Sequence, residues 1–117
     1  MPRTVLIVDD HPTFRATARA LLASEGYEVV GEAADGRSAL EAARELHPEI
    51  VLLDVQLPDI DGFEIASLLA ANGSSAAVVM TSSRDSSDFG SLVEESGARG
   101  FIPKAELSAA ALSALLE

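Results

Sequence analysis

The sequence contains no cysteine and no tryptophan, and its aromatic residues are limited to one tyrosine and four phenylalanines. Without cysteine, the chain can form neither a disulfide framework nor a thiolate metal site. The scarcity of aromatic rings argues against a site that stacks nucleic-acid bases or a flavin. These absences leave oxygen and nitrogen side chains to carry any chemistry.

Basic residues are also scarce, since 8 lysines and arginines face 19 aspartates and glutamates, for a formal net charge of -11. Such a chain repels phosphate backbones, so we expect no direct contact with nucleic acid. Its partners are expected to be cations or basic protein surfaces.

Long hydrophobic runs are missing as well. The N-terminal stretch "MPRTVLIVDD" turns acidic after a short apolar run, which fits neither a signal peptide nor a membrane span. We therefore expect a cytoplasmic protein without membrane contact. At 117 residues, the chain has the length of one domain, residues 1–117.

Five short apolar runs recur along the chain, at residues 5–8, 29–30, 50–53, 78–80 and 101–102. Their continuous rather than alternating pattern is typical of parallel strands that are covered on both faces. Segments with helical spacing lie between them, and the last two helices are expected at about 85–96 and 106–116.

The first three helices carry start and stop signals. The first has apolar residues at i, i+4, i+7 and i+8 and ends before Gly26. Asp35 and Asp61 are typical caps for the second and third helices, which end near Pro48 and Gly73. Strict alternation of five strands and five helices predicts an α/β, flavodoxin-like, doubly wound (βα)5 fold. The five-stranded parallel sheet would have the order 2-1-3-4-5.

In such a sheet, ligands bind at the carboxyl ends of the strands, between the first and third strands. Asp9 and Asp10 follow the first strand, and Asp54 follows the third. Three converging carboxylates repel one another unless some are protonated or a cation is bound. Because we expect only oxygen ligands, with no histidine or cysteine nearby, a hard ion is favoured, Mg²⁺ above all. The simpler alternative is that Asp9 and Asp10 cap a helix that begins at Pro12.

Hydroxyl groups in "VVMTSS" and the ammonium group of Lys104 in "GFIPK" are expected at the same edge of the sheet. Alone, each would be interpreted as a cap or a solvated charge. Together with the three acids they predict a phosphoryl site in which a carboxylate accepts the group and cations neutralise it.

The motifs "LIVDDHP", "LLDVQLPDIDG", the hydroxyl after "VVM" and "GARGFIPK" resemble the receiver domain of bacterial two-component response regulators. The likeness covers nearly the whole chain. It implies phosphorelay signal transduction, in which the phosphohistidine of a sensor histidine kinase donates to the receiver. The domain would not be an enzyme in the ordinary sense, although it takes part in its own phosphorylation and dephosphorylation.

The resemblance implies a role for each matching residue. Asp54 would be the phosphoacceptor and a metal ligand, and Lys104 would bind the phosphoryl group. Asp10 would bind Mg²⁺ directly (Mn²⁺ being the alternative ion), Asp9 would bind it through water, and the backbone carbonyl of Gln56 would complete the set.

The resemblance also implies a switch. Phe101 would be the aromatic residue that turns inward when a strand-end hydroxyl moves toward the phosphoryl group. Ser82 has the family's usual spacing from Lys104 and is favoured, whereas Thr81 is the more usual residue type and stays the alternative. The helix at 85–96, the strand at 101–102 and the helix at 106–116 would form the output and dimerisation face.

One feature departs from the family pattern, because Pro103 precedes Lys104, whereas many receivers place proline after the lysine. "DDHPTF" resembles the subfamily that carries a helix-turn-helix DNA-binding output. We expect no output domain within residues 1–117, so the sequence is either part of a longer protein or a natural single-domain receiver. DNA would be bound only through an output domain, if the full-length protein has one. His11 is interpreted as a helix-start residue near the site, since the phosphohistidine belongs to the partner.

Two other function classes share some of these features. A receiver could work by protein contact alone, without phosphorylation. A phosphatase of the haloacid-dehalogenase group also forms an aspartyl-phosphate, but it carries acids two residues apart at the first strand end, whereas Asp9 and Asp10 are adjacent.

Overall fold

The computed structural model describes residues 3–84 and 88–116. Its strands form one parallel sheet in the order β2-β1-β3-β4-β5, as the sequence predicts. The strands are β1 (Thr4–Val8), β2 (Glu28–Ala33), β3 (Ile50–Asp54), β4 (Ala77–Ser82) and β5 (Gly100–Pro103).

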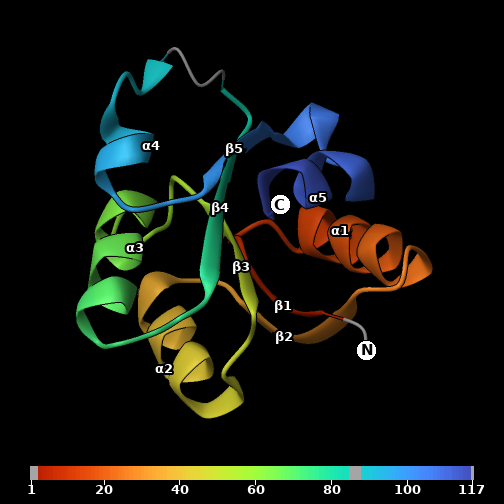
Figure 1. Ribbon diagram of the computed structural model, residues 1–117, viewed down its shortest axis with the longest axis horizontal. Coiled ribbons are helices and arrows are strands. Elements are labelled where there is room, and N and C mark those ends of the chain that lie inside the picture. Colours follow the sequence, from red (N-terminus) through yellow and green to blue (C-terminus); the bar gives the residue numbers. More distant parts are fainter. Residues whose placement is uncertain (1–2, 85–87, 117) are drawn as a thin grey trace.

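Helices cover both faces of this sheet. They are α1 (Pro12–Ser24), α2 (Gly36–Leu46), α3 (Gly62–Ala71), α4 (Leu92–Glu95) and α5 (Ala109–Leu116), with a short 3₁₀ helix, η2 (Lys104–Glu106), before the last. Helices α1 and α5 lie on one face, whereas α2, α3 and α4 lie on the other (Figure 1). The arrangement confirms the flavodoxin-like fold.

Two hydrophobic cores result from the alternation of side chains along each strand. In β3, Val51 and Leu53 belong to the core beneath α2 and α3, whereas Ile50 and Leu52 belong to the core beneath α1 and α5. All four are at most 1% exposed. Full burial of such a side chain contributes about 1.5–3 kcal/mol, so β3 anchors the sheet from both faces and its last residue is held firmly.

The predicted signals for α2 and α3 are confirmed. Asp35 accepts a hydrogen bond from the N–H of Ser38, and Asp61 accepts one from the N–H of Glu64. Past the end of α3, Gly73 has a φ of +82°, a left-handed conformation that favours glycine.

The start of α1 differs from the simpler alternative. Its N-cap is His11, whose side chain makes no capping hydrogen bond, and Pro12 begins the helix. Asp9 instead accepts the backbone N–H of His11 at 2.8 Å. Capping of α1 by Asp9 or Asp10 is therefore wrong for this structure.

The last two predicted helices are shorter than expected. Helix α4 begins only at Leu92, because Gly90 adopts a left-handed φ of +58° that interrupts a helix. Residues 85–87 of the predicted helix lie outside the described residues. In the predicted segment 106–116, Glu106 still belongs to η2 and α5 begins only at Ala109, where the hydroxyl of Ser108 accepts the N–H of Ala111.

Within residues 3–84 and 88–116, none of the helices has both the length and the apolar character that a membrane crossing requires.

Candidate functional site

Two buried carboxylates meet where β1 and β3 end. Val8 and Leu53 are partners in the parallel pairing of these strands, so Asp9 and Asp54 follow side by side at the carboxyl edge. Asp9 is 0% exposed and Asp54 is 3% exposed. Asp10 joins them from the loop, with a side chain that is 38% exposed. The predicted convergence of the three acids is what the fold produces.

Lys104, the only lysine in the sequence, lies between the two buried acids. Its Nζ atom is 2.7 Å from Oδ2 of Asp9 and 3.3 Å from Oδ2 of Asp54. The ammonium also lies 4.6 Å from the ring centroid of Phe14. The contact with Asp9 is a short ion pair, in which the ammonium neutralises the buried Oδ2 atom of Asp9.

Burial and charge shift the titration of this cluster. Burial raises the pKa of Asp54, and the negative charge of Asp9 adds to this, while the Gln56 N–H and the Lys104 ammonium oppose it. For Lys104, burial disfavours the ammonium, but the close contact with Asp9 and the charges of both acids outweigh it and raise its pKa. The 2.7 Å separation makes the pairing of Lys104 with Asp9 electrostatically strong.

The cluster fits a divalent cation. When ionised, Asp9, Asp10 and Asp54 bring three negative charges against one positive charge on Lys104. Ligand atoms of these acids lie within 4.8 Å of one another. Hard carboxylate oxygens of this kind suit Mg²⁺.

His11 lies beside the same cluster, which corrects the expectation that no histidine is nearby. Its Nδ1 atom is 3.0 Å from Oδ1 of Asp9 and 3.1 Å from Oδ1 of Asp10. The signal was present in the sequence, because His11 directly follows Asp9 and Asp10 and therefore shares their loop.

The backbone around Asp54 is held by the loop that follows it. The N–H of Gln56 donates to Oδ1 of Asp54 at 3.2 Å, and the N–H of Gly62 donates to the carbonyl of Val55 at 2.7 Å. A Cβ atom on Gly62 would lie within van der Waals overlap of the carbonyl oxygen of Asp54. The sequence did not reveal this close approach, because Gly62 could be interpreted only as the residue that follows the helix cap Asp61.

Both candidate hydroxyls lie at the end of β4 and are 1% exposed. Thr81 is in register with Asp54, and its hydroxyl has no hydrogen-bond partner among the described residues. The Ser82 hydroxyl accepts the N–H of Arg84 at 3.1 Å. Ser82 pairs with Pro103, the residue before Lys104, so both residues lie on β4 next to strands that carry the site.

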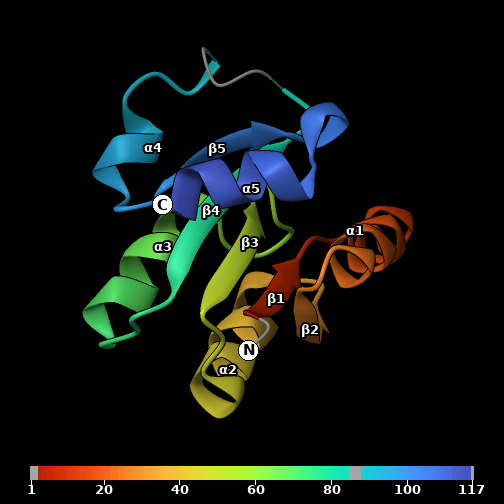
Figure 2. The same cartoon turned by 45° about the vertical axis from the view of Figure 1, so that its right-hand side comes forward.

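Phe101, on β5, is half-buried and packs against another aromatic ring. Its ring centroid lies 5.6 Å from that of Phe89, which in turn lies 5.6 Å from that of Phe63. This row of three rings joins β5 to α3 and to the segment before α4. The ribbon in Figure 2 shows α4 beside α3.

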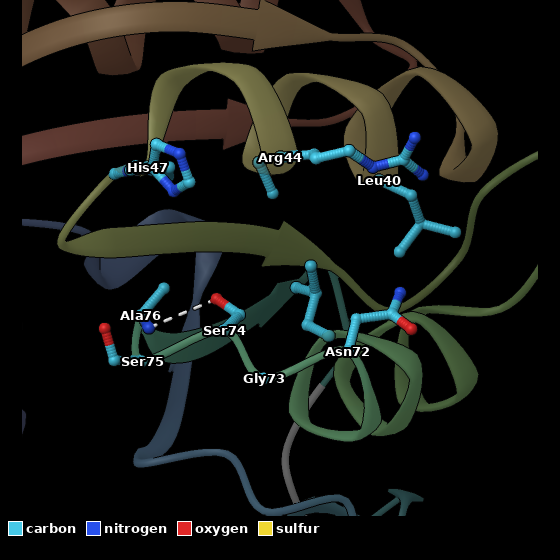
Figure 3. A pocket seen from close by; sticks show the side chains of 11 residues that line it. Leu40, Arg44, His47, Asn72, Gly73, Ser74, Ser75 and Ala76 are labelled. Carbon is cyan, nitrogen blue, oxygen red and sulfur yellow. Dashed lines mark hydrogen bonds between the residues drawn. The ribbon is translucent and has the colours of Figure 1, made fainter.

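A cavity of about 440 Å³ lies at the amino ends of β3 and β4, on the side of the sheet away from the acidic cluster. It is bounded by the carboxyl ends of α2 and α3 (Figure 3). Its lining includes His47 and Pro48, which precede β3, and Ser75 and Ala76, which precede β4. None of the acids of the cluster lines it, so this cavity is separate from the carboxylate site.

Comparisons with known proteins show the family of this chain. Residues 5–117 match the family described as "Response regulator receiver domain". The chain is 40% identical over 106 residues to the "Virulence factors putative positive transcription regulator BvgA" of Bordetella pertussis, and the match covers 91% of this chain and 51% of BvgA. The chain thus spans about half the length of the curated relatives it matches.

Solved structures of similar chains share the fold. A two-component response regulator of the LuxR family from Aurantimonas sp. SI85-9A1 has a TM-score of 0.88 and 32% identity, covering 99% of this chain and 86% of that one. The CheX-CheY-BeF3-Mg²⁺ complex from Borrelia burgdorferi contains a chain with a TM-score of 0.87 and 29% identity, covering 99% and 87%. The chain belongs to the response regulator receiver domain family.

Proposed function

We propose that this receiver accepts a phosphoryl group on Asp54 from the phosphohistidine of a sensor histidine kinase. The observation that carries the proposal is the position of Asp54, a buried carboxylate at the end of β3 with Lys104 at 3.3 Å. The exchange is placed in the cytoplasm, because a kinase needs ATP. Residues 1–117 would constitute the receiver domain.

The chemistry needs little beyond positioning and charge. An oxygen of Asp54 attacks phosphorus, the phosphorus–nitrogen bond of the donor breaks, and the donor imidazole keeps the electron pair. The Gln56 N–H holds Oδ1 of Asp54 at 3.2 Å, which orients the carboxylate. Lys104 stabilises the added negative charge. The domain assists its own reaction, and the kinase supplies the phosphoryl group.

Mg²⁺ is the proposed cofactor, with Mn²⁺ as the alternative. Asp10, Asp54 and the backbone carbonyl of Gln56 would bind it directly, and Asp9 would bind it through water. When bound, the ion neutralises charge on the phosphoryl oxygens. The acidic cluster supports this assignment, as does the similarity of this chain to the complex that contains CheY, BeF3 and Mg²⁺.

Phosphorylation is proposed to change the face formed by α4, β5 and α5. The hydroxyl of Ser82, or that of Thr81 as the alternative, would move toward the phosphoryl group, and Phe101 would change its rotamer. The contact between the rings of Phe101 and Phe89 supports a link to the segment before α4. This face would form a homodimer or meet an output domain.

The output is proposed to be transcription, because the relative BvgA is named as a transcription regulator, and this chain matches about half of it. DNA would then be bound by the remaining part of such a protein, and the acidic receiver would make no direct contact with nucleic acid. A receiver that acts by protein contact alone is the main alternative, but it would have no use for a buried acid beside a lysine.

The test is incubation with acetyl phosphate and Mg²⁺, followed by the mass of the intact protein. We expect a gain of one phosphoryl group in the wild-type chain, and none after chelation of the metal or in Asp54→Asn. Glu45→Gln, at an exposed position on α2, is the control that should keep the gain. An unmodified wild-type chain would instead favour the receiver that acts by contact alone.

A further inference from the structure

His11 is held against the acidic cluster by its own backbone. The N–H of His11 donates to Oδ1 of Asp9 at 2.8 Å, and the ring Nδ1 atom approaches the same oxygen at 3.0 Å. The ring also lies 3.1 Å from Oδ1 of Asp10, and 66% of the side chain is exposed. The imidazole therefore covers the solvent side of the cluster with a nitrogen directed at two acids.

The spacing of the donor atoms suits a single ion. Ligand atoms of Asp9, Asp10, His11 and Asp54 all lie within 4.8 Å of one another. Ligands that bind one small divalent ion at about 2.1 Å span at most about 4.2 Å, so a small contraction brings the nitrogen into the set. Oδ2 of Asp9 faces the Lys104 ammonium at 2.7 Å, so Oδ1, the oxygen beside the imidazole of His11, is the one left to face an ion.

We propose that His11 is a metal ligand that shifts the preference of the acidic site from Mg²⁺ toward transition ions such as Co²⁺ and Zn²⁺. Imidazole nitrogen suits these ions, whereas Mg²⁺ prefers oxygen ligands and retains its waters. The inference rests in part on the proposed function, since it uses the same acids.

A purely structural His11 would have a different effect. As the N-cap of α1 and a partner of Asp9, it would position the acids for every divalent ion alike. Its replacement would then change the affinities for Mg²⁺ and for Co²⁺ by the same factor. The ratio of the two affinities therefore separates a ligand from a positioning residue.

The experiment compares His11→Asn with His47→Asn in the full chain. Asparagine is a good N-cap and tolerates the left-handed φ of 46° at His47. These are the only two histidines of the sequence, and His47 lines the cavity at the amino ends of β3 and β4. Calorimetry gives the affinities for Mg²⁺, Co²⁺ and Zn²⁺, and NMR of the Co²⁺-loaded chain detects paramagnetically shifted imidazole protons.

We expect His11→Asn to weaken Co²⁺ and Zn²⁺ binding about 10- to 100-fold, in line with the effect of losing a partner at a metal site. Mg²⁺ binding should change less than about twofold, and the shifted imidazole signals should disappear. His47→Asn should match the wild type. Equal losses for all three ions, or no loss, would overturn the role of His11 while leaving the proposed Mg²⁺ site intact. A wild-type chain that binds none of the ions would overturn both.

Discussion

Replacement of Lys104 by methionine is expected to lower the free energy of unfolding by about 3–5 kcal/mol at neutral pH. Methionine keeps the apolar stem beside Phe14 but removes the ammonium that lies 2.7 Å from Asp9 and 3.3 Å from Asp54. Two buried carboxylates would then face each other without a cation. Urea or thermal unfolding of the metal-free protein measures the loss.

The loss should depend on pH with a defined sign. Burial raises the pKa of Asp54 above its ordinary value of 3.8, and the removal of Lys104 takes away a group that lowers it. A carboxyl whose pKa is raised by folding destabilises the fold progressively as pH rises through and above the ordinary value. The difference between Lys104→Met and the wild type should therefore shrink toward roughly pH 4.

Two further variants test this explanation. The double variant Lys104→Met/Asp54→Asn should recover much of the loss, because only one of the two buried charges remains unpaired. Arg99→Met removes the same charge at an exposed position and should change stability by less than about 0.5 kcal/mol. Equal effects of Lys104→Met and Arg99→Met would show that Lys104 does not pair the buried acids.

Gly62→Ala is expected to destabilise the protein by about 3 kcal/mol and to impair phosphoryl uptake at the same time. The new Cβ atom would overlap the carbonyl oxygen of Asp54 and would lie 2.9 Å from the Cα atom of Val55. Both are backbone atoms that cannot rotate away, so the end of β3 must shift. Unfolding and acetyl-phosphate labelling measure the two effects.

The matched control for this variant is Gly90→Ala. Gly90 has a φ of +58°, and a methyl group added there would meet nothing within 4 Å, so alanine carries only the backbone penalty of about 1–2 kcal/mol. It should leave phosphoryl uptake unchanged. Should Gly62→Ala unfold like the wild type, the loop after β3 would be free to adjust and would not fix Asp54.

Much of the fold could be predicted because the local signals agree with the tertiary structure. The apolar runs of the strands, the caps Asp35 and Asp61 and the stop at Gly73 all correspond to observed features. The helix predicted over 85–96 begins too early. The residues at the beginning of that segment are typical of a helix start, but Gly90 adopts a left-handed φ, and the helix begins only after it, at Leu92.

The topology of the sheet predicts which residues meet at the site, but it does not predict the contacts between them. Parallel pairing of β1 with β3 brings Asp9 to Asp54 in any doubly wound sheet, so their convergence could be predicted. The turn of His11 back onto Asp9 and the close approach of Gly62 to Asp54 depend on loop geometry. No periodicity in the sequence encodes such contacts.

Phosphorylation of Asp54 is the step on which the proposed function depends, and chemical mapping tests it most directly. The chain is treated with acetyl phosphate and Mg²⁺, the acyl phosphate is reduced with borohydride, and the reduced residue is located by peptide mass spectrometry. We expect the reduced residue to be Asp54, and we expect no reduction when either acetyl phosphate or Mg²⁺ is left out. Reduction at Asp9 or Asp10, or at no residue of the chain, would contradict the assignment of Asp54 as the phosphoacceptor.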